Sequence, residues 1–484
     1  QGEICLIRSQ NIYNDGFKPN GLVYITEESA EKLKNVIVEK GDILLNITGD
    51  SVARVCLARK EYIPARVNQH VAIIRPEPEE FDARYLRYLL ASPAIQNFLL
   101  TIAAVGATRS ALTKNMIETL EVSKPPLGIQ TSIADNLESL DNKIELNRQT
   151  NQTLEHIAQA LFKCWFVDFE PTRAKIIAKE KGANTAIQEL AAQAIICGAI
   201  TLEQLEAITQ DLETTLQQAI NEKLSQANQT PINTEQLKTT AALFPNALVD
   251  SDGVTNSSGT NLHERSEPEG GGSGASRLIP EGWEVLPLSK MIEIIGGGTP
   301  KKSESDYWDG DIPWFSVKDA PADGDVFVID TDLKITELGL SKSSTKLLPE
   351  GVTIISARGT VGRLALVGVP TAMNQSCYGI KGASGAGPYL NYFNVKNAVE
   401  MLQQNTHGAV FDTITTGTFD TVYSVNSGQK LKDVFEALVS DNFKKIKNNL
   451  FESNGLIEIR DALLPKLLSG ELTPNTATNI EYIK

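Results

Sequence analysis

Two sets of polar side chains stand at the ends of short apolar runs, and their types are those that bind nucleic acid by hydrogen bonds. Arginine, asparagine and glutamine can pair with base edges, while serine, threonine and lysine suit phosphate oxygens. The first set of candidate DNA-binding residues is Arg8, Ser9, Gln10, Asn11, Thr48, Asn68, Gln69, His70, Thr108, Arg109 and Ser110. The second set is Thr299, Lys301, Lys302, Ser316, Lys318, Ser356, Arg358, Thr360, Arg363, Asn374, Gln375, Ser376, Thr413, Thr415 and Thr416.

The two sets lie on matching stretches of sequence. GDIPWFSVKDAPADG resembles GEICLIRSQNIYNDG at an offset of 308 (310 − 2), and EGVTIISARGTVG resembles KGDILLNITGDSV at 310 (351 − 41). MNQSCYGIK resembles VNQHVAIIR at 306 (374 − 68), and the loop at Gly408 matches the loop at Gly106 at 302. One such loop alone fits an ordinary solvated turn. Recurrence with different side chains at equivalent places favours two readers of different sequences on a common frame.

No catalytic or metal-binding signature accompanies these loops. The sequence has no GxxxxGK[ST] phosphate loop, no HExxH zinc motif and no NPP[FY]-type methyltransferase motif. Its four histidines are scattered, and its five cysteines are odd in number with no CxxC pair, which is typical of reduced structural thiols. We therefore predict no catalytic residue, no metal site and no enzyme activity of its own.

A long helix is predicted over 129–168, and it carries a seam. The seam positions Ile133, Leu137, Leu140, Ile144, Asn147, Asn151, Leu154, Ala158 and Leu161 alternate steps of four and three, the heptad spacing of a helix that pairs with another. Asn147 and Asn151 place amides mid-seam, where they would reject partners and registers that leave them without hydrogen bonds.

A second helix is predicted over 433–468, where adding 302 to the first set of positions gives a degenerate copy. Its seam positions include Val439, Ile446, Asn449, Leu456 and Leu463, while Asn442 and Arg460 break the match. We expect the two helices to pair antiparallel within the chain, with intermolecular pairing as the alternative.

The fold class predicted is α+β (mixed α/β), internally duplicated, with two globular modules joined by two long helices in an intramolecular antiparallel coiled coil. Six apolar runs predict strands in the first module, followed by a helix over 83–100 and a strand over 117–122. The second module starts well upstream of Gly310, so the first is expected to lack a comparable opening segment. The predicted divisions are 1–125 (module 1), 126–172 (helix), 173–280 (two helices broken near Gly198, then a flexible linker), 281–428 (module 2), 429–470 (helix) and 471–484 (tail).

Bulk composition limits the partners. A net charge of −15 argues mildly against nucleic acid, although a total cannot resolve charge on one face. The chain has no run of about eighteen apolar residues and no signal peptide at its start, so no membrane association or export is expected.

Taken together, these motifs resemble the specificity subunits of type I restriction-modification systems. The likeness lies in five stretches. GWEVLPLSKMIEIIGGGTPKK opens module 2, GDILLNITGD and NQHVAII lie in module 1, LEHIAQALFKCWFVDFEPTRAK closes the first long helix and IRDALLPKLLSGEL closes the second. The resemblance implies a non-catalytic subunit with two target-recognition domains that read a bipartite double-stranded DNA site. It also implies docking of two methyltransferase subunits, which carry S-adenosylmethionine, and of motor-nuclease subunits. The reduced cysteines predict a cytoplasmic location.

The helix is expected to act as a ruler, because 129–162 would span about 50 Å at 1.5 Å per residue. Inserting one heptad in both helices should then lengthen the tolerated spacer of the DNA site. The alternative function is a coiled-coil scaffold with two protein-binding modules, and an independent enzyme comes third. The half-site sequences, the spacer length and the role of the 173–280 insert stay open.

Overall fold

The computed structural model describes residues 2–104, 110–225, 233–250, 278–322, 324–405 and 413–473. The chain divides into two compact units, which are described separately. Unit 1 is Gln1–Leu146 with Glu452–Lys484, and unit 2 is Asn147–Phe451. Module 1 lies in unit 1 and module 2 in unit 2.

Module 1 is built on two small sheets and a hairpin. The sheet orders are β4-β1-β8-β5 and β7-β6-β9, and β2 pairs with β3. β1 runs antiparallel to β4 and parallel to β8, while β6 is antiparallel to both of its neighbours. The strands are β1 Ile4–Ile7, β2 Ile12–Tyr13, β3 Gly16–Phe17, β4 Val23–Ile25, β5 Ile37–Val38, β6 Ile43–Asn46, β7 Val55–Leu57, β8 Ala65–Val67 and β9 Val71–Ile74.

Module 2 repeats these pairings. β14 lies between antiparallel β16 and parallel β19, as β1 lies between β4 and β8, and β17 lies between β18 and β20. β13 adds an edge to β20, and no described residue of module 1 supplies a counterpart. The strands are β12 Glu284–Pro287, β13 Ile292–Gly296, β14 Trp308–Phe315, β15 Phe327–Val328, β16 Lys334–Ile335, β17 Thr353–Ser356, β18 Leu364–Val367, β19 Ala372–Met373, β20 Cys377–Gly382 and β21 Tyr423–Asn426. The internal duplication is therefore present in the fold.

The helices of the modules correct two predictions. The single helix expected over 83–100 is split into α2 (Ala83–Ala91) and α3 (Pro93–Ala104), because Pro93 has no N–H to continue α2 and instead begins α3. The strand expected over 117–122 is wrong. Helix α4 (Lys114–Glu118) stands there, and the Thr113 side chain caps it by accepting from Met116 N–H. The other helices of the modules are α1 Glu27–Glu31, α11 Glu337–Ser341 and α12 Pro388–Asn405.

Short 3-10 turns follow several strands in both modules. They span Ser9–Asn11, Lys34–Val36, Lys60–Tyr62, Leu288–Lys290, Ser305–Tyr307, Val317–Asp319 and Thr416–Asp420. Two of them, Ser9–Asn11 after β1 and Val317–Asp319 after β14, occupy equivalent places in the duplicated frame.

The two long helices are α5 (Leu127–Phe162) and α13 (Gln429–Ser469), and a π-helical turn, Lys163–Val167, extends α5. In unit 1, Ile133 and Leu137 of α5 share a core with Leu464 and Leu467 of α13. In unit 2, Phe162 packs on Phe435, and Asn151 pairs with Asn449 further along both helices. Residue numbers increase along α5 in the direction in which they decrease along α13, so the two helices run antiparallel within unit 2.

The amides of the seam meet in unit 2. Asn449 Nδ2 donates to Asn151 Oδ1 at 2.9 Å, and Asn147 Nδ2 donates to the Asn449 carbonyl at 3.5 Å. All three side chains are buried. Of the other seam residues, Leu137, Val439 and Ile446 are buried, while the partly exposed ones are Leu140, Ile144, Leu154, Leu161, Leu456 and Leu463.

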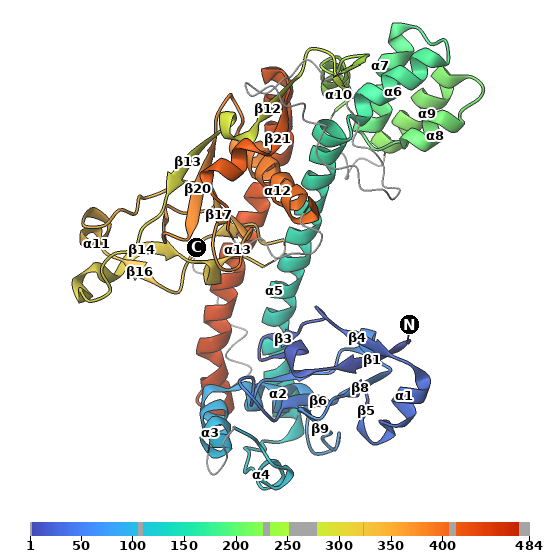
Figure 1. The fold of residues 1–484 in the computed structure, drawn as a ribbon. Coiled ribbons are helices and arrows are strands. Elements are labelled where there is room, and N and C mark those ends of the chain that lie inside the picture. Colours follow the sequence, from blue (N-terminus) through green and yellow to red (C-terminus); the bar gives the residue numbers. More distant parts are fainter. Residues whose placement is uncertain are drawn as a thin grey trace. The chain divides into compact units, whose positions relative to one another are not determined.

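A bundle of helices follows α5 in unit 2 (Figure 1). It consists of α6 Glu170–Glu180, α7 Thr185–Ile196, α8 Leu202–Ala207, α9 Leu212–Ser225 and α10 Thr234–Ala241. The two helices predicted here are too few, although the break near Gly198 is present: Gly198 has a φ of +65° and α7 ends at Ile196. The boundary predicted at 172 falls inside α6. Strand β10 (Leu248–Asp250) pairs with β11 (Leu278–Pro280), and the predicted linker between them lies outside the described residues.

Candidate nucleic-acid interface

Four segments of module 1 are joined by three backbone hydrogen bonds where the predicted polar loops begin. Asn68 N–H donates to the Ile7 carbonyl at 3.1 Å, which joins the loop before β9 to the end of β1. Ile47 N–H donates to the His70 carbonyl at 2.9 Å, and Leu112 N–H donates to the Ile47 carbonyl at 2.8 Å. The loops after β1 and β6, the loop before β9 and the segment at 110–112 thus form one frame.

Module 2 forms the same frame with the equivalent residues. Asn374 N–H donates to the Phe315 carbonyl at 2.9 Å, and Ala357 N–H donates to the Ser376 carbonyl at 2.7 Å. Ile414 N–H donates to the Ala357 carbonyl at 2.9 Å. The offsets from module 1 are 306 (374 − 68), 310 (357 − 47) and 302 (414 − 112), which equal those of the sequence repeats.

Side chains reinforce the frame in both copies. Asn68 Oδ1 accepts from His70 N–H at 3.1 Å, and Asn374 Oδ1 accepts from Ser376 N–H at 2.9 Å. The same two-residue reach closes each turn, as asparagine commonly does. Asn68 and Asn374 therefore shape the loop, and the residues that follow them face outward from it.

Different side chains occupy equivalent positions on this common frame. Thr48 in module 1 corresponds to Arg358 in module 2, since each forms an isolated backbone bridge to the segment from 111 or 413. His70 likewise corresponds to Ser376. His70 Nδ1 lies 2.6 Å from Thr48 Oγ1, and its Nε2 lies 3.4 Å from the Gln69 amide nitrogen. A ring that accepts from Gln69 at Nε2 donates from Nδ1 to Thr48, which fixes its orientation.

A hollow of about 620 Å³ opens between the loops of module 1. Five of the predicted residues line it, and the structure therefore brings them together: Ser9, Gln10, Thr48, His70 and Ser110. Tyr13, Asp50, Ser51 and Arg54 complete the polar part of its wall. The hollow offers hydrogen-bond donors and acceptors side by side, as recognition of a base edge requires.

Module 2 presents cations instead. Lys301, Lys302, Lys318, Arg358 and Arg363 are all exposed, and none of them forms an ion pair with a described residue. Thr299 donates to Gln375 Oε1 between two of the predicted loops. Thr360, Thr413, Thr415 and Thr416 are exposed as well, with Thr415 bonded to Thr418. These exposed cations without ion-pair partners among the described residues are available to contact phosphate, whatever the acidic total of the chain.

Some predicted DNA-binding residues are structural. Asn11 is fully buried, accepts from Arg8 N–H at 3.1 Å and donates to the Lys18 carbonyl at 2.9 Å. Ser356 is fully buried, and its hydroxyl donates to the Thr360 carbonyl at 2.6 Å. The prediction that these two side chains contact DNA is wrong, because burial and saturated hydrogen bonds leave them unavailable.

Other predicted residues are held by their own module or lie outside the structure. Arg8 Nη2 donates to the Gly21 carbonyl at 2.6 Å, and Ser316 Oγ donates to Asp319 Oδ2 at 2.7 Å. Thr108 and Arg109 lie outside the described residues.

Tyr13 and Arg54 are missing from the predicted set, although Arg363, the counterpart of Arg54, is in it. The backbone shows the equivalence: Asn46 N–H donates to the Arg54 carbonyl and Ser356 N–H to the Arg363 carbonyl, both at 2.9 Å. The repeat GDSVAR against GTVGR contained the signal, but it requires a one-residue change of offset, to 309 (363 − 54).

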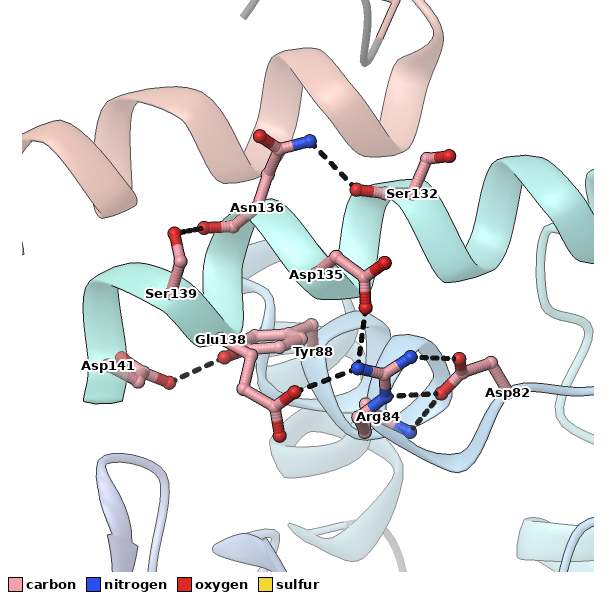
Figure 2. Close-up of polar contacts among 9 residues, drawn as sticks. All are labelled: Asp82, Arg84, Tyr88, Ser132, Asp135, Asn136, Glu138, Ser139 and Asp141. Atoms are coloured by element: carbon pink, nitrogen blue, oxygen red, sulfur yellow. Dashed lines mark hydrogen bonds and ion pairs between the residues drawn. The ribbon is translucent and has the colours of Figure 1, made fainter. Parts of the chain in front are cut away.

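Module 1 is anchored to α5 by polar contacts that Figure 2 shows. Arg84 of α2 donates to Asp82 Oδ2 at 2.7 Å, and its Nη1 contacts Asp135 at 2.7 Å and Glu138 at 2.8 Å on α5. Burial raises the pKa of Asp82, but the hydrogen bonds and charge of Arg84 outweigh it, so that this pKa lies below its ordinary value. The carboxylate is therefore stabilised in its charged form.

Asp141 of α5 is a second anchor. Its Oδ2 accepts from Tyr88 Oη of α2 at 2.6 Å (Figure 2). The same Oδ2 accepts from Arg87 of α2 at 3.3 Å, and Oδ1 accepts from Arg460 Nη1 of α13 at 2.9 Å. Arg460 breaks the heptad match in the sequence, and this ion pair is the reason it is tolerated. One carboxylate joins α2, α5 and α13.

Module 2 is anchored in a related way. Lys396 and Tyr392 of α12 donate to Glu155 Oε1 of α5 at 2.6 and 3.2 Å. Glu436 of α13 accepts from the first N–H groups of α12, Tyr389 at 3.0 Å and Leu390 at 3.1 Å. Burial raises the pKa of Glu436 despite these two bonds. Each module is thus fastened to α5 or α13 through a helix of its own, α2 in module 1 and α12 in module 2.

Two cysteines lie beneath the frame. Burial raises the pKa of Cys56 to about 12 and that of Cys377 to about 12. Both thiols stay protonated at neutral pH and are poor nucleophiles. The described residues contain no group of three His, Cys, Asp or Glu side chains placed to hold a metal ion. None of the helices that the structure describes is both long and apolar enough to span a membrane.

Comparison with known proteins agrees with this architecture. The family model of the type I restriction modification DNA specificity domain matches residues 1–156 and 280–423, once in each half of the chain. The chain belongs to this type I specificity family. The HindI specificity subunit of Haemophilus influenzae is 30% identical over 439 residues, which are 90% of this chain and 87% of that protein. The MjaIX specificity subunit of Methanocaldococcus jannaschii is 29% identical over 187 residues, 37% of this chain and 43% of that protein.

Solved structures of the specificity family are also similar. The S subunit of a type I restriction-modification system from M. genitalium has a TM-score of 0.47 and 13% identity, covering 96% of this chain and 89% of that one. The HsdS subunit from Thermoanaerobacter tengcongensis has a TM-score of 0.29 and 14% identity, covering 97% and 91%. Specificity subunits are non-catalytic, and the scaffold alternative is not favoured by these relatives.

Proposed function

We propose that this chain selects the DNA site of a type I restriction-modification complex, with each module reading one half of a bipartite double-stranded sequence. The observation that carries the proposal is the duplicated frame. Three backbone hydrogen bonds of module 1 recur in module 2 at the offsets of the sequence repeats, while Thr48 and His70 are replaced by Arg358 and Ser376. A common frame with exchanged side chains is what two different half-sites need.

The surfaces of the modules support different ways of reading DNA. Module 1 offers a hollow with mixed donors and acceptors, whereas module 2 offers exposed arginine, lysine and threonine side chains. Arginine pairs best with guanine, and lysine and threonine contact phosphates. The two half-sites should therefore differ in sequence.

The long helices provide surfaces for protein partners. Leu146 of α5 and Ile459 of α13, both in unit 1, are 56% and 47% exposed, and Ile157 of α5 in unit 2 is 50% exposed. Single exposed apolar side chains are common on protein surfaces, so the main support for protein partners comes from the relatives, which are named as subunits of type I restriction enzymes. The partners proposed are two methyltransferase subunits, which would bring S-adenosylmethionine, and motor-nuclease subunits. The assembly would work in the cytoplasm, with no cofactor bound by this chain.

The test is a selection of randomised duplexes with the chain copurified with its methyltransferase partner, followed by sequencing. A motif of two blocks separated by a fixed nonspecific gap is expected. In the variant Arg358→Ala only the block read by module 2 should lose sequence preference. Absence of enrichment in a complex that demonstrably contains both subunits would contradict the proposal. The alternative function, a coiled-coil scaffold with two protein-binding modules, would then be favoured.

A further inference from the structure

On the basis of the proposed function, we infer that the hollow of module 1 is a base-reading pocket in which Arg54, stacked on Tyr13, selects a guanine. The Arg54 guanidinium carbon lies 4.7 Å from the centroid of the Tyr13 ring. A guanidinium packed over an aromatic face makes no hydrogen bond to the ring carbons and keeps its N–H groups available for a ligand. Arg54 is also half-buried at the start of β7, so its side chain is limited in the positions it can take.

The donors of Arg54 are not used by any residue that the structure describes. No described residue forms an ion pair or a side-chain hydrogen bond with its guanidinium. Lys18 lies 4.3 Å from the centroid of the same ring, but its ammonium is paired with Asp15 at 3.0 Å. Among the described residues, Lys18 has a carboxylate within ion-pair distance and Arg54 has none.

The other walls of the hollow favour a base pair over a phosphate. The exposed carboxylate of Asp50 lines it together with Thr48, His70 and Gln10. Asp50 would repel a phosphate, but it can accept from the amino group of a cytosine. Arginine can donate both of its hydrogen bonds to guanine O6 and N7 in the major groove. Arg54 and Asp50 together match the two partners of one G·C pair.

Module 2 also has an arginine at this position, but it has no aromatic ring that corresponds to Tyr13. Arg363 stands at the equivalent place, and its Nη2 donates to the Pro321 carbonyl at 3.0 Å. Pro321 corresponds to Tyr13 at the offset of 308 (321 − 13) that relates these segments. A carbonyl therefore takes one donor of Arg363, whereas an aromatic ring supports Arg54 without taking any. The inference accordingly concerns module 1 alone.

The experiment compares variants of the full chain, copurified with its methyltransferase partner, in the randomised-duplex selection. Arg54→Ala should reduce the preference for guanine at one position of the module 1 half-site by about 5- to 150-fold, the range that one bidentate pair supplies. Arg54→Lys keeps the charge and should lower the same preference, because an ammonium cannot make the paired contact. Asp50→Asn should weaken the preference at the same base pair.

Lys32→Ala is the matched control. It also removes one positive charge from module 1, but Lys32 is paired with Glu28 on the surface and does not line the hollow. It should leave the motif unchanged. Amide hydrogen exchange in α2 verifies that each variant is folded. If Arg54→Ala unfolds the module, Arg54→Lys decides the outcome.

Three results would overturn the inference. A uniform loss of affinity in Arg54→Ala, with the motif unchanged and a salt slope smaller by about 1, would make Arg54 a phosphate contact. An unchanged motif at unchanged affinity would make it a structural residue. A wild-type complex that selects no bipartite motif would instead contradict the proposed function, and the inference with it.

Discussion

Replacing Asp141 with alanine removes the carboxylate that joins α2, α5 and α13 in unit 1. Three donors lose their acceptor: Tyr88 Oη at 2.6 Å, Arg460 Nη1 at 2.9 Å and Arg87 Nη1 at 3.3 Å. The side chains of Arg87 and Arg460 are only 8% and 18% exposed, so water can hydrate them little. Removing one partner of a buried ion pair costs about 3–5 kcal/mol. Arg87 keeps a bond to the Asn14 carbonyl and Arg460 keeps Asp461, so we expect the lower end, about 3 kcal/mol.

The assay must report on unit 1, and the tryptophans do not. All four, Trp165, Trp283, Trp308 and Trp314, lie in unit 2. Amide hydrogen exchange in α2 is therefore the measurement, while tryptophan fluorescence during urea unfolding serves as an internal control. A loss of about 3 kcal/mol accelerates exchange through opening of unit 1 by about a hundredfold or more.

Asp461→Ala is the matched control, because Asp461 contacts the same guanidinium at 2.8 Å but is 59% exposed. An exposed ion pair contributes about 0.2–1 kcal/mol, so exchange should rise by less than about sixfold. Equal effects of the two variants on α2 would refute the assignment of Asp141 as a buried anchor. A shift of the fluorescence transition by Asp141→Ala would show that its effect is not confined to unit 1.

Three further perturbations address unit 2, and each can be followed by tryptophan fluorescence during urea unfolding. Asn449→Leu leaves Asn151 Oδ1 buried without its donor and should lower the free energy of unfolding by about 1–3 kcal/mol. The control Asn448→Leu, at an exposed neighbouring position, should be nearly neutral, and equal losses in the two variants would contradict the buried seam. Burial raises the pKa of Asp325 above its ordinary 3.8, so the folded state binds this proton more tightly and unit 2 loses stability as pH rises from about 3.8 through the folded pKa. Asp325→Asn should therefore become progressively more stable than wild type across that window, and a constant difference at every pH would be inconsistent with it. Gly324→Ala should lower the free energy of unfolding by about 1–3 kcal/mol, because φ is +90° and the added Cβ would lie 2.3 Å from Gln152 Cγ. Gly428→Ala is the control, since a Cβ at that position has no atom within 4 Å. A neutral Gly324→Ala would contradict the loop geometry.

The duplication and the long helices were predictable because each is a pattern repeated many times. The heptad seam has nine positions in register over 133–161, and four repeat segments keep their order with offsets of 302 to 310. Errors at single residues cannot hide patterns of that length. The backbone hydrogen bonds reproduce the same offsets in space.

Local signals were harder to interpret. The apolar run at 117–122 resembles a strand, but Thr113 caps a helical turn that begins just before it. Strands β2 and β3 have two residues each, which is too short to show alternation. Asn11 and Ser356 have the side-chain types of DNA-reading residues, and only their burial shows that they hold turns instead. Arg54 was missed because its match to Arg363 requires a one-residue change of offset, and its packing over Tyr13 is not encoded as a motif.

The central claim is that two modules on one frame read two separate half-sites. The most direct test is to map methylated bases by sequencing DNA from cells that produce this chain with its methyltransferase partner, in wild-type and Arg358→Ala forms. We expect methylation at a motif of two blocks with a fixed gap, and in Arg358→Ala a relaxed sequence in one block with the other block and the gap unchanged. A single continuous motif, or a change in both blocks from this one substitution, would contradict the account.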